Sequence, residues 1–234
     1  ASGPTEGHIQ RPSDGKEPKT VVIIKCVGSR DPNKGVSYCS RACCMYSAKH
    51  AHQYLDKVKD GRCFVFYMDV RCAGKGYDEF YMNTLQDGAT YVRGRVSKIY
   101  PEDGKLVCTG EDTLSSQVVR VDADMVVLET AMVPSDGSTQ IATVLNAQRG
   151  PEGFFTEAHP KLRPVETNTA GIFLAGVAQG PKDIPDTVAQ AGAAASKVIG
   201  LLAKGQIESN PMIVHVNNAK CSGCGACVDI CPYG

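Results

Sequence analysis

Cysteine is the residue type in this sequence with the greatest capacity for chemistry, and the chain holds 11 cysteines among 234 residues. A disulfide framework is one explanation, but such frameworks belong mainly to small secreted domains with poor cores. This chain has apolar runs that could build a core, no visible export signal, and an odd count that would leave one thiol unpaired. Reduced thiolates that bind metal therefore explain the cysteines better.

The stretch "CSGCGACVDICP" carries four cysteines with the spacing C-x2-C-x2-C-x3-C, followed by Pro232. This spacing is the cysteine run of bacterial ferredoxins, whose thiolates bind iron–sulfur clusters. Gly223 and Gly225 would let the backbone wrap closely and direct N–H groups toward sulfide. A zinc knuckle is the alternative, but the usual loop between two CxxC halves is missing. The predicted [4Fe-4S] ligands are Cys221, Cys224, Cys227 and Cys231.

The last cysteine of such a run ligates the other cluster in two-cluster ferredoxins. We therefore expect Cys231 to serve a second cluster whose other ligands lie past Gly234. The chain begins without Met and stops at "CPYG", which predicts that it is a fragment of a longer protein.

A second group of cysteines, Cys26, Cys39, Cys43 and Cys44, has the spacing C-x12-C-x3-C-C. Cys26 ends a predicted strand, and the other three lie where a helix is predicted to begin. Strand carboxyl ends and helix N-termini share one edge of a parallel sheet, so the four thiolates should converge there on a cluster. The positive end of the helix would favour the negative charge of that cluster. One alternative stays open, because a member such as Cys44 could simply pack in the core.

The elements around this group alternate between strand and helix. Short apolar runs predict strands at residues 20–28 and 62–70, and helices are predicted at 40–58 and 76–88, a β-α-β-α order typical of a parallel sheet with crossover helices. The first helix has one apolar face, made by Cys44, Ala48, Ala51, Leu55 and Val58.

Residues 90–130 have a different pattern. Alternating stretches at 90–100, 105–110 and 116–122, with a tight turn at Asp103-Gly104, predict a small antiparallel meander, and a buried strand follows at 123–130. The predicted fold class is a nucleotide-binding-type α/β domain carrying a β-meander, followed by the start of a ferredoxin-like segment. We expect a polar connecting segment at 1–19, the α/β domain at 20–132, the C-terminal part of a cofactor domain at 133–205 and the ferredoxin-like segment at 206–234.

The stretch "TNTAGIFLAGVAQGPKDIPDTVAQAG" predicts a strand from Gly171 to Ala175, a glycine-containing loop, and a helix capped by Asp183. It resembles the C-terminal flavin motif of the FAD-dependent, thioredoxin-reductase-like disulfide oxidoreductases, with Val177 in place of the family Asp. An ordinary strand–loop–helix crossover is the alternative. The resemblance implies an FAD site at Gly176, Val177, Lys182, Asp183, Ile184, Asp186, Thr187 and Gln190.

Within this motif, free N–H groups of the first helical turn would bond the flavin. Pro185 has no N–H, so Asp186 and Thr187 are the expected backbone donors, and Gln190 could add a side-chain contact. No G-x-G-x-x-G phosphate loop is found, so that part of an FAD site would lie upstream of residue 1.

The stretches "KCVGSRD", "YCSRACCMYSAK", "GKGYDEFY" and "GIFLAGVAQGPKDIPDTVAQA", together with the ferredoxin run, resemble the A subunit of heterodisulfide reductase over nearly the whole chain. The resemblance implies a cytoplasmic iron–sulfur flavoprotein of anaerobes that holds FAD beside an unusual cluster, with flavin-based electron bifurcation in methanogens. It also implies a homodimer within a larger complex, whose partners are other subunits of that kind, a hydrogenase or dehydrogenase donor, and ferredoxin.

Lys49 lies just over one helical turn past Cys44 and could reach a bound flavin, where it would stabilise the anionic reduced form; the alternative is a solvated helix lysine. Two other functions remain open, a pyridine-nucleotide disulfide reductase and a zinc-binding structural module. The 25 basic and 25 acidic residues give no electrostatic case for nucleic acid or anionic membranes, and the apolar runs are too short to span a bilayer. Cys63 and Cys108 are predicted as strand cysteines, and Cys72 as a loop thiol.

Overall fold

The computed structural model describes residues 3–206 and 214–231, and the chain forms two compact units, Ala1–Ser196 and Lys197–Gly234. The finer division into four segments stays a prediction. Among the described helices, none has the length and apolar character needed to cross a membrane.

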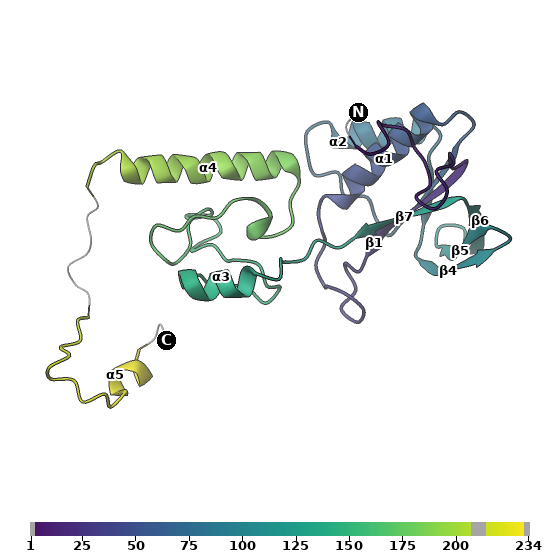
Figure 1. Cartoon of the computed structure of the whole chain (residues 1–234). Coiled ribbons are helices and arrows are strands. Elements are labelled where there is room, and N and C mark those ends of the chain that lie inside the picture. Colours follow the sequence, from purple (N-terminus) through teal and green to yellow (C-terminus); the bar gives the residue numbers. More distant parts are fainter. Residues whose placement is uncertain (1–2, 207–213, 232–234) are drawn as a thin grey trace. The chain divides into compact units, whose positions relative to one another are not determined.

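A four-stranded parallel sheet forms the centre of the first unit (Figure 1). Its strands are β1 (Thr20–Val27), β2 (Arg62–Tyr67), β3 (Thr90–Arg93) and β7 (Met125–Thr130), in the order β3-β2-β1-β7. In the central pairings Val21 lies opposite Cys63 of β2 and opposite Met125 of β7. The parallel sheet predicted from the apolar runs is confirmed.

Helices α1 (Cys43–Lys57) and α2 (Tyr77–Gln86) cover one face of this sheet (Figure 1). Val21 and Ile23 of β1 point to that face, where a buried cluster also contains Ala51, Tyr54, Val58, Cys63, Val65 and Ala89. The predicted apolar face of α1 is confirmed, but the predicted helix start near Ser40 was wrong. Arg41 has a φ of +56°, in the left-handed region, so a right-handed helix cannot extend back through it.

The opposite face of the parallel sheet packs on a three-stranded antiparallel sheet of β4 (Val96–Glu102), β5 (Lys105–Asp112) and β6 (Gln117–Ala123). Val22 and Ile24 of β1 point to this side, with Cys108 of β5 in the same buried cluster. The β-meander is confirmed, as is its two-residue turn, since Asp103 and Gly104 both have positive φ. Cys63 and Cys108 are therefore core strand cysteines, as predicted.

The single strand predicted at residues 90–100 was wrong, because residues 90–93 form β3 in the parallel sheet and the meander begins only at Val96. The chain crosses between the sheets at Gly94. A Cβ at that position would lie 1.8 Å from the carbonyl oxygen of Glu111, so only glycine fits the crossing.

The rest of the first unit contains α3 (Ser138–Leu145), a short 3-10 turn η1 (Gly176–Ala178) and the first part of α4 (Ile184–Leu202). The strand predicted from Gly171 to Ala175 was wrong. Only Phe173 makes an isolated antiparallel bridge, to Glu166, and within the described residues this stretch has no strand neighbour to complete a ladder. In the second unit the described residues include the four-residue helix α5 (Ala226–Asp229).

Candidate metal and cofactor sites

Three cysteines of the first predicted group lie together at the edge where β1 ends and α1 begins. Cys26 is the penultimate residue of β1, and Cys43 and Cys44 are the first two residues of α1. All three are buried, and the Cys43 thiol lies within hydrogen-bonding reach of both Cys26 and Cys44. The topology therefore brings thiols that are far apart in sequence to one place.

Cys39 occupies the loop before α1 and is half-buried. Its sulfur accepts a hydrogen bond of 3.3 Å from the amide of Arg41. Negative charge on Cys39, like that on Cys26, contributes to raising the pKa of Arg30. No set of three or more His, Cys, Asp or Glu side chains in the described ranges is arranged to hold a metal ion. The four-cysteine cluster thus stays a prediction, supported by the contact among three of its members.

The surroundings of these thiols favour negative charge. The hydrogen bond from Cys43 lowers the pKa of Cys26 to about 6 and that of Cys44 to about 5, in both cases against the opposing effect of burial. Arg30 and Lys25 lower the pKa of Cys26 further. Sharing its single S–H proton with Cys26 and Cys44 raises the pKa of Cys43. A donor set of thiolates beside cations and a helix N-terminus fits an anionic iron–sulfur cluster.

Lys25 and Arg30 are functional candidates that the sequence analysis missed. Lys25 is only 6% exposed and donates a hydrogen bond of 3.1 Å to the carbonyl oxygen of Asp69. Arg30 forms an ion pair of 2.6 Å with the Asp69 carboxylate. A lysine inside the apolar run "VVIIKCV" was the available signal, because a buried ammonium needs a local negative partner.

A groove of about 840 Å³ opens beside this group. Ala42, Met45, Tyr46 and Lys49 line it from the start of α1, and Lys75, Gly76, Tyr77 and Phe80 line it from α2 and the residues before it. Six residues predicted at the FAD site also line the groove, namely Lys49, Val177, Lys182, Asp183, Ile184 and Thr187. Gly176, Asp186 and Gln190 are not among the lining residues.

The predicted cap of α4 is confirmed, because the Asp183 carboxylate accepts a hydrogen bond of 2.9 Å from the Asp186 amide. The Thr187 amide donates at 3.0 Å to the carbonyl oxygen of Asp183. Both backbone donors predicted for the flavin therefore already have partners within the chain. Of the non-proline amides in this first turn, only that of Ile184 has no partner among the described residues.

Gln190 also has a different contact from the one predicted. Its side-chain oxygen accepts a hydrogen bond of 2.7 Å from the Gly176 amide, and its side-chain nitrogen donates to Gln179. Gly176 has a φ of +65°, and a Cβ there would lie 3.1 Å from the Thr187 methyl group. These contacts hold the 176–179 turn against α4, so Gln190 shapes the wall of the groove.

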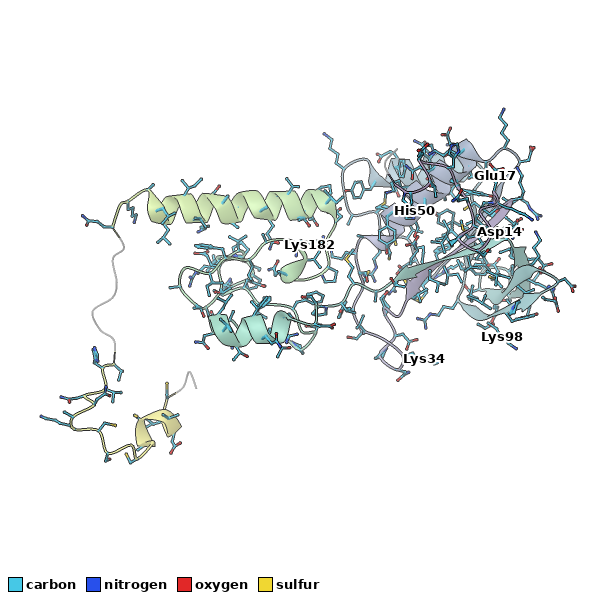
Figure 2. All side chains as sticks on the ribbon, in the orientation of Figure 1. Asp14, Glu17, Lys34, His50, Lys98 and Lys182 are labelled. Carbon is cyan, nitrogen blue, oxygen red and sulfur yellow. The ribbon has the colours of Figure 1, made fainter. Side chains whose placement is uncertain are left out.

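Lys182 lies on the loop before α4 (Figure 2). Its ammonium donates to the side chain of Gln179 at 3.3 Å and to the carbonyl oxygen of Gly180 at 3.1 Å. Burial, and then the nearby Arg41, lowers the pKa of Lys182.

Two long-range contacts hold the start of α4, one from the loop before α1 and one from α2, and the sequence analysis missed both. Arg41 forms an ion pair of 2.7 Å with Asp186, and the Tyr77 hydroxyl donates at 2.9 Å to Asp183. The partners are 145 and 106 residues apart in sequence, so no local pattern signals them.

The groove fits a flavin by its chemistry. Its walls are mostly apolar, with three aromatic side chains, Tyr46, Tyr77 and Phe80, and they also carry the amines of Lys49 and Lys182. Small-molecule sites are usually apolar clefts of about 300–1,000 Å³ with a few placed polar groups. The lysines would favour negative charge on a reduced cofactor.

In the second unit the four cysteines of the ferredoxin run are all exposed. Gly223 and Gly225 both have positive φ, and the Gly223 amide donates a hydrogen bond of 3.4 Å to the Cys221 sulfur. The amide of Ala226 lowers the pKa of Cys224. Backbone N–H groups that point at thiolates are the contacts expected from the two glycines.

Sequence comparisons place these features in a known context. Residues 214–234 match the family model described as a 4Fe-4S binding domain. The chain is 50% identical over 237 residues to the iron-sulfur A subunit 2 of the CoB–CoM heterodisulfide reductase of Methanopyrus kandleri, an alignment that covers 100% of this chain and 36% of the relative. It is 47% identical over 236 residues to the A subunit of the H(2):CoB-CoM heterodisulfide,ferredoxin reductase of Methanothermobacter thermautotrophicus, with the same coverage.

The chain belongs with the A subunits of heterodisulfide reductases. It spans 36% of the length of these two relatives, which are named as subunits of reductases.

Solved structures show the fold. A thioredoxin reductase from T. acidophilum has a TM-score of 0.52 at 17% identity, with 78% of this chain and 52% of that one covered. The Lactococcus lactis thioredoxin reductase has a TM-score of 0.51 at 14% identity, with 79% and 53% covered. The fold class is therefore thioredoxin-reductase-like, as predicted, and a 4Fe-4S binding motif follows at residues 214–234.

Proposed function

We propose that this chain is part of an electron-transfer subunit in which FAD, held in the groove, exchanges electrons with [4Fe-4S] clusters held by the two cysteine groups. The observation that carries the proposal is the position of the groove on α1. The same helix begins with Cys43 and Cys44 and lines the groove with Met45, Tyr46 and Lys49. A flavin in the groove would thus lie next to a cluster on that helix start.

The flavin, when bound, supplies the exchange between two-electron and one-electron chemistry. The chain supplies position and charge. Asp183 caps α4 and binds Tyr77, which fixes one wall of the groove against another. Lys49 and Lys182 place positive charge along the groove, and Lys25 and Arg30 do the same around the thiols.

The partners belong to the same proposal. The relatives are named as heterodisulfide reductase subunits, one of them with hydrogen and ferredoxin in its name. We expect this protein to work with other subunits of that kind, with a hydrogenase or dehydrogenase as donor and ferredoxin as a further partner. Flavin-based bifurcation would then divide electron pairs between the disulfide-reducing partner and ferredoxin.

The test is cofactor analysis of the complete protein, purified without oxygen. We expect FAD together with iron and sulfide, and a broad visible absorption that dithionite bleaches. Val177→Trp should fill the groove and release FAD while iron content is kept, because Val177 lines the groove and is 39% exposed. Val188→Trp is the control, on an exposed position of α4 outside the lining. Colourless protein with stoichiometric zinc, or equal flavin loss in both variants, would contradict the proposal.

A further inference from the structure

The fourth predicted cluster ligand, Cys39, differs from the other three in where it lies. Cys26 belongs to β1, and Cys43 and Cys44 belong to α1, so the regular backbone of these elements fixes their positions. Cys39 lies in the loop before α1 and is half-buried. Groups on loops are placed less precisely than groups on helices or strands, so a ligand on a loop needs support from its neighbours.

The residues on the two sides of Cys39 bind the same distant residue. The Tyr38 hydroxyl donates a hydrogen bond of 2.9 Å to the carbonyl oxygen of Met132. The Met132 amide donates one of 3.0 Å to the hydroxyl oxygen of Ser40, which is only 1% exposed. We call Tyr38, Ser40 and Met132 the Met132 clamp. Because it holds the chain on both sides of Cys39, it fixes the orientation of that residue as well as its position.

Further contacts attach the Met132 clamp to its surroundings. The carbonyl oxygen of Tyr38 accepts a hydrogen bond of 3.0 Å from the Arg30 amide. The Tyr38 ring packs edge-on against the buried Phe154, with 5.6 Å between the ring centroids. Met132 follows β7 closely and lines the groove. The loop that carries Cys39 is therefore attached to the segment that leaves the parallel sheet beside the groove.

We propose that Tyr38 and Ser40 are positioning residues that hold Cys39 as the fourth ligand of a [4Fe-4S] cluster. They act through their two hydrogen bonds to Met132. The inference rests on the proposed function, because it requires that the four thiolates bind a cluster. Residues behind the ligands of a metal site orient those ligands, and their loss weakens metal binding. Without the Met132 clamp, the iron bound by Cys39 is the one that the cluster loses first.

Controlled oxidation of the anaerobic holoprotein measures how firmly that iron is held. Ferricyanide takes one electron from a [4Fe-4S]2+ cluster and becomes ferrocyanide. Departure of one Fe2+ then leaves a [3Fe-4S]+ cluster, which paramagnetic resonance detects. The readout is the rate at which this three-iron signal appears, and it requires no turnover. Clusters elsewhere in the protein contribute the same background to every variant.

Tyr38→Phe and Ser40→Ala should each speed formation of the three-iron cluster about fivefold, and the double variant about 25-fold. Each change removes one ordinary hydrogen bond, so the ligand is detached for a correspondingly larger fraction of the time. Tyr38→Phe keeps the aromatic ring that packs on Phe154. Ser47→Ala is the matched control, since Ser47 is also buried but its hydroxyl donates within its own helix, at 2.6 Å to the carbonyl oxygen of Cys43. That variant should match the wild type.

Cys39→Ser is the reference for a lost ligand, because a serine oxygen binds iron of such clusters less well than a thiolate. It should form the three-iron cluster fastest, or contain it before oxidation. If Cys39→Ser instead behaves like the wild type, Cys39 is no ligand, and the proposed cluster is refuted together with the positioning role. If Cys39→Ser is fast but the double variant matches Ser47→Ala, the positioning role alone is overturned. Flavin content should stay at the wild-type value in Tyr38→Phe and Ser40→Ala; parallel loss of flavin and iron would mean a general loss of the fold and would also overturn that role.

Discussion

The Asp183 carboxylate accepts two hydrogen bonds at the groove, and their contributions to local stability can be separated. One oxygen caps α4 through the Asp186 amide at 2.9 Å, and the other accepts the Tyr77 hydroxyl at 2.9 Å. Loss of an N-cap side chain costs about 1 kcal/mol. The Tyr77 hydrogen bond is partly exposed, so it contributes about 1 kcal/mol, the value of an ordinary hydrogen bond and less than that of a buried bond to a charged group. Asp183→Ala should therefore weaken the first turn of α4 by about 2 kcal/mol.

Hydrogen–deuterium exchange at the Thr187 amide measures this local stability, because its acceptor, the backbone carbonyl oxygen of Asp183, is kept in every variant. Since each 1.4 kcal/mol is a factor of ten, Asp183→Ala should speed exchange about 30-fold and Tyr77→Phe about fivefold. Asp183→Ala combined with Tyr77→Phe should exchange no faster than Asp183→Ala alone, because both changes remove the same hydrogen bond. In Asp183→Ala the pKa of Tyr77 should fall toward its ordinary value, because hydrogen bonding to Asp183 is what raises it most.

Tyr81→Phe is the control, because it removes a hydroxyl from the same helix α2, one turn further on. It should leave exchange at the Thr187 amide unchanged. If Tyr77→Phe behaves like Tyr81→Phe, the contact between α2 and α4 contributes nothing to the groove wall. If the two substitutions at Asp183 and Tyr77 add, they do not act through one hydrogen bond.

Three other changes test separate parts of the chain. Burial of Asp124 raises its pKa, but the Lys105 ammonium and two backbone amides have the larger combined effect, so the pKa is lowered. The free energy of unfolding should therefore rise with pH across the acid range as the carboxylate ionises. Asp124→Asn should flatten that rise in acid titrations of chemical denaturation and cost about 1–2 kcal/mol near neutrality, and an unchanged slope would refute this. Cys224→Ser should remove the C-terminal cluster, seen as lost iron and lost paramagnetic signal, while the cluster predicted at α1 stays; unchanged iron content would count against the assignment. Gly176→Ala places a Cβ 3.1 Å from Thr187 at a φ of +65°, so it should cost about 1 kcal/mol and weaken flavin retention, which equilibrium dialysis measures.

The sequence by itself determined the elements whose signals are local. The continuous apolar run at 20–28 predicted a strand, and Val21 and Val22 of β1 point into cores on opposite faces of the sheet. Asp183 three residues before Asp186 predicted the cap of α4, because capping joins near neighbours in the chain. The spacing of the ferredoxin run likewise predicted the 4Fe-4S binding domain that residues 214–234 match.

Other features depended on which segments the fold brings together. Gly94 has to be glycine because the backbone of Glu111, on another strand, lies against it. The chain passes from one sheet to the other at this glycine, so residues 90–100 form two strands although they alternate like one. Residues 171–175 form no strand, because Phe173 and its neighbours pair only briefly with residues 165–167, in a single isolated bridge that no further strand extends.

The candidate site shows the same division. The sequence indicated Gln190 as a cofactor contact. Its side chain instead accepts a hydrogen bond from the amide of Gly176, 14 residues earlier in the chain. Glu129 gave no signal at all, because a glutamate near a strand end is usually solvated. Its burial, and the 3.4 Å contact of its carboxylate with Nδ1 of His50, depend on the pairing of β7 with β1, which brings together segments about 80 residues apart.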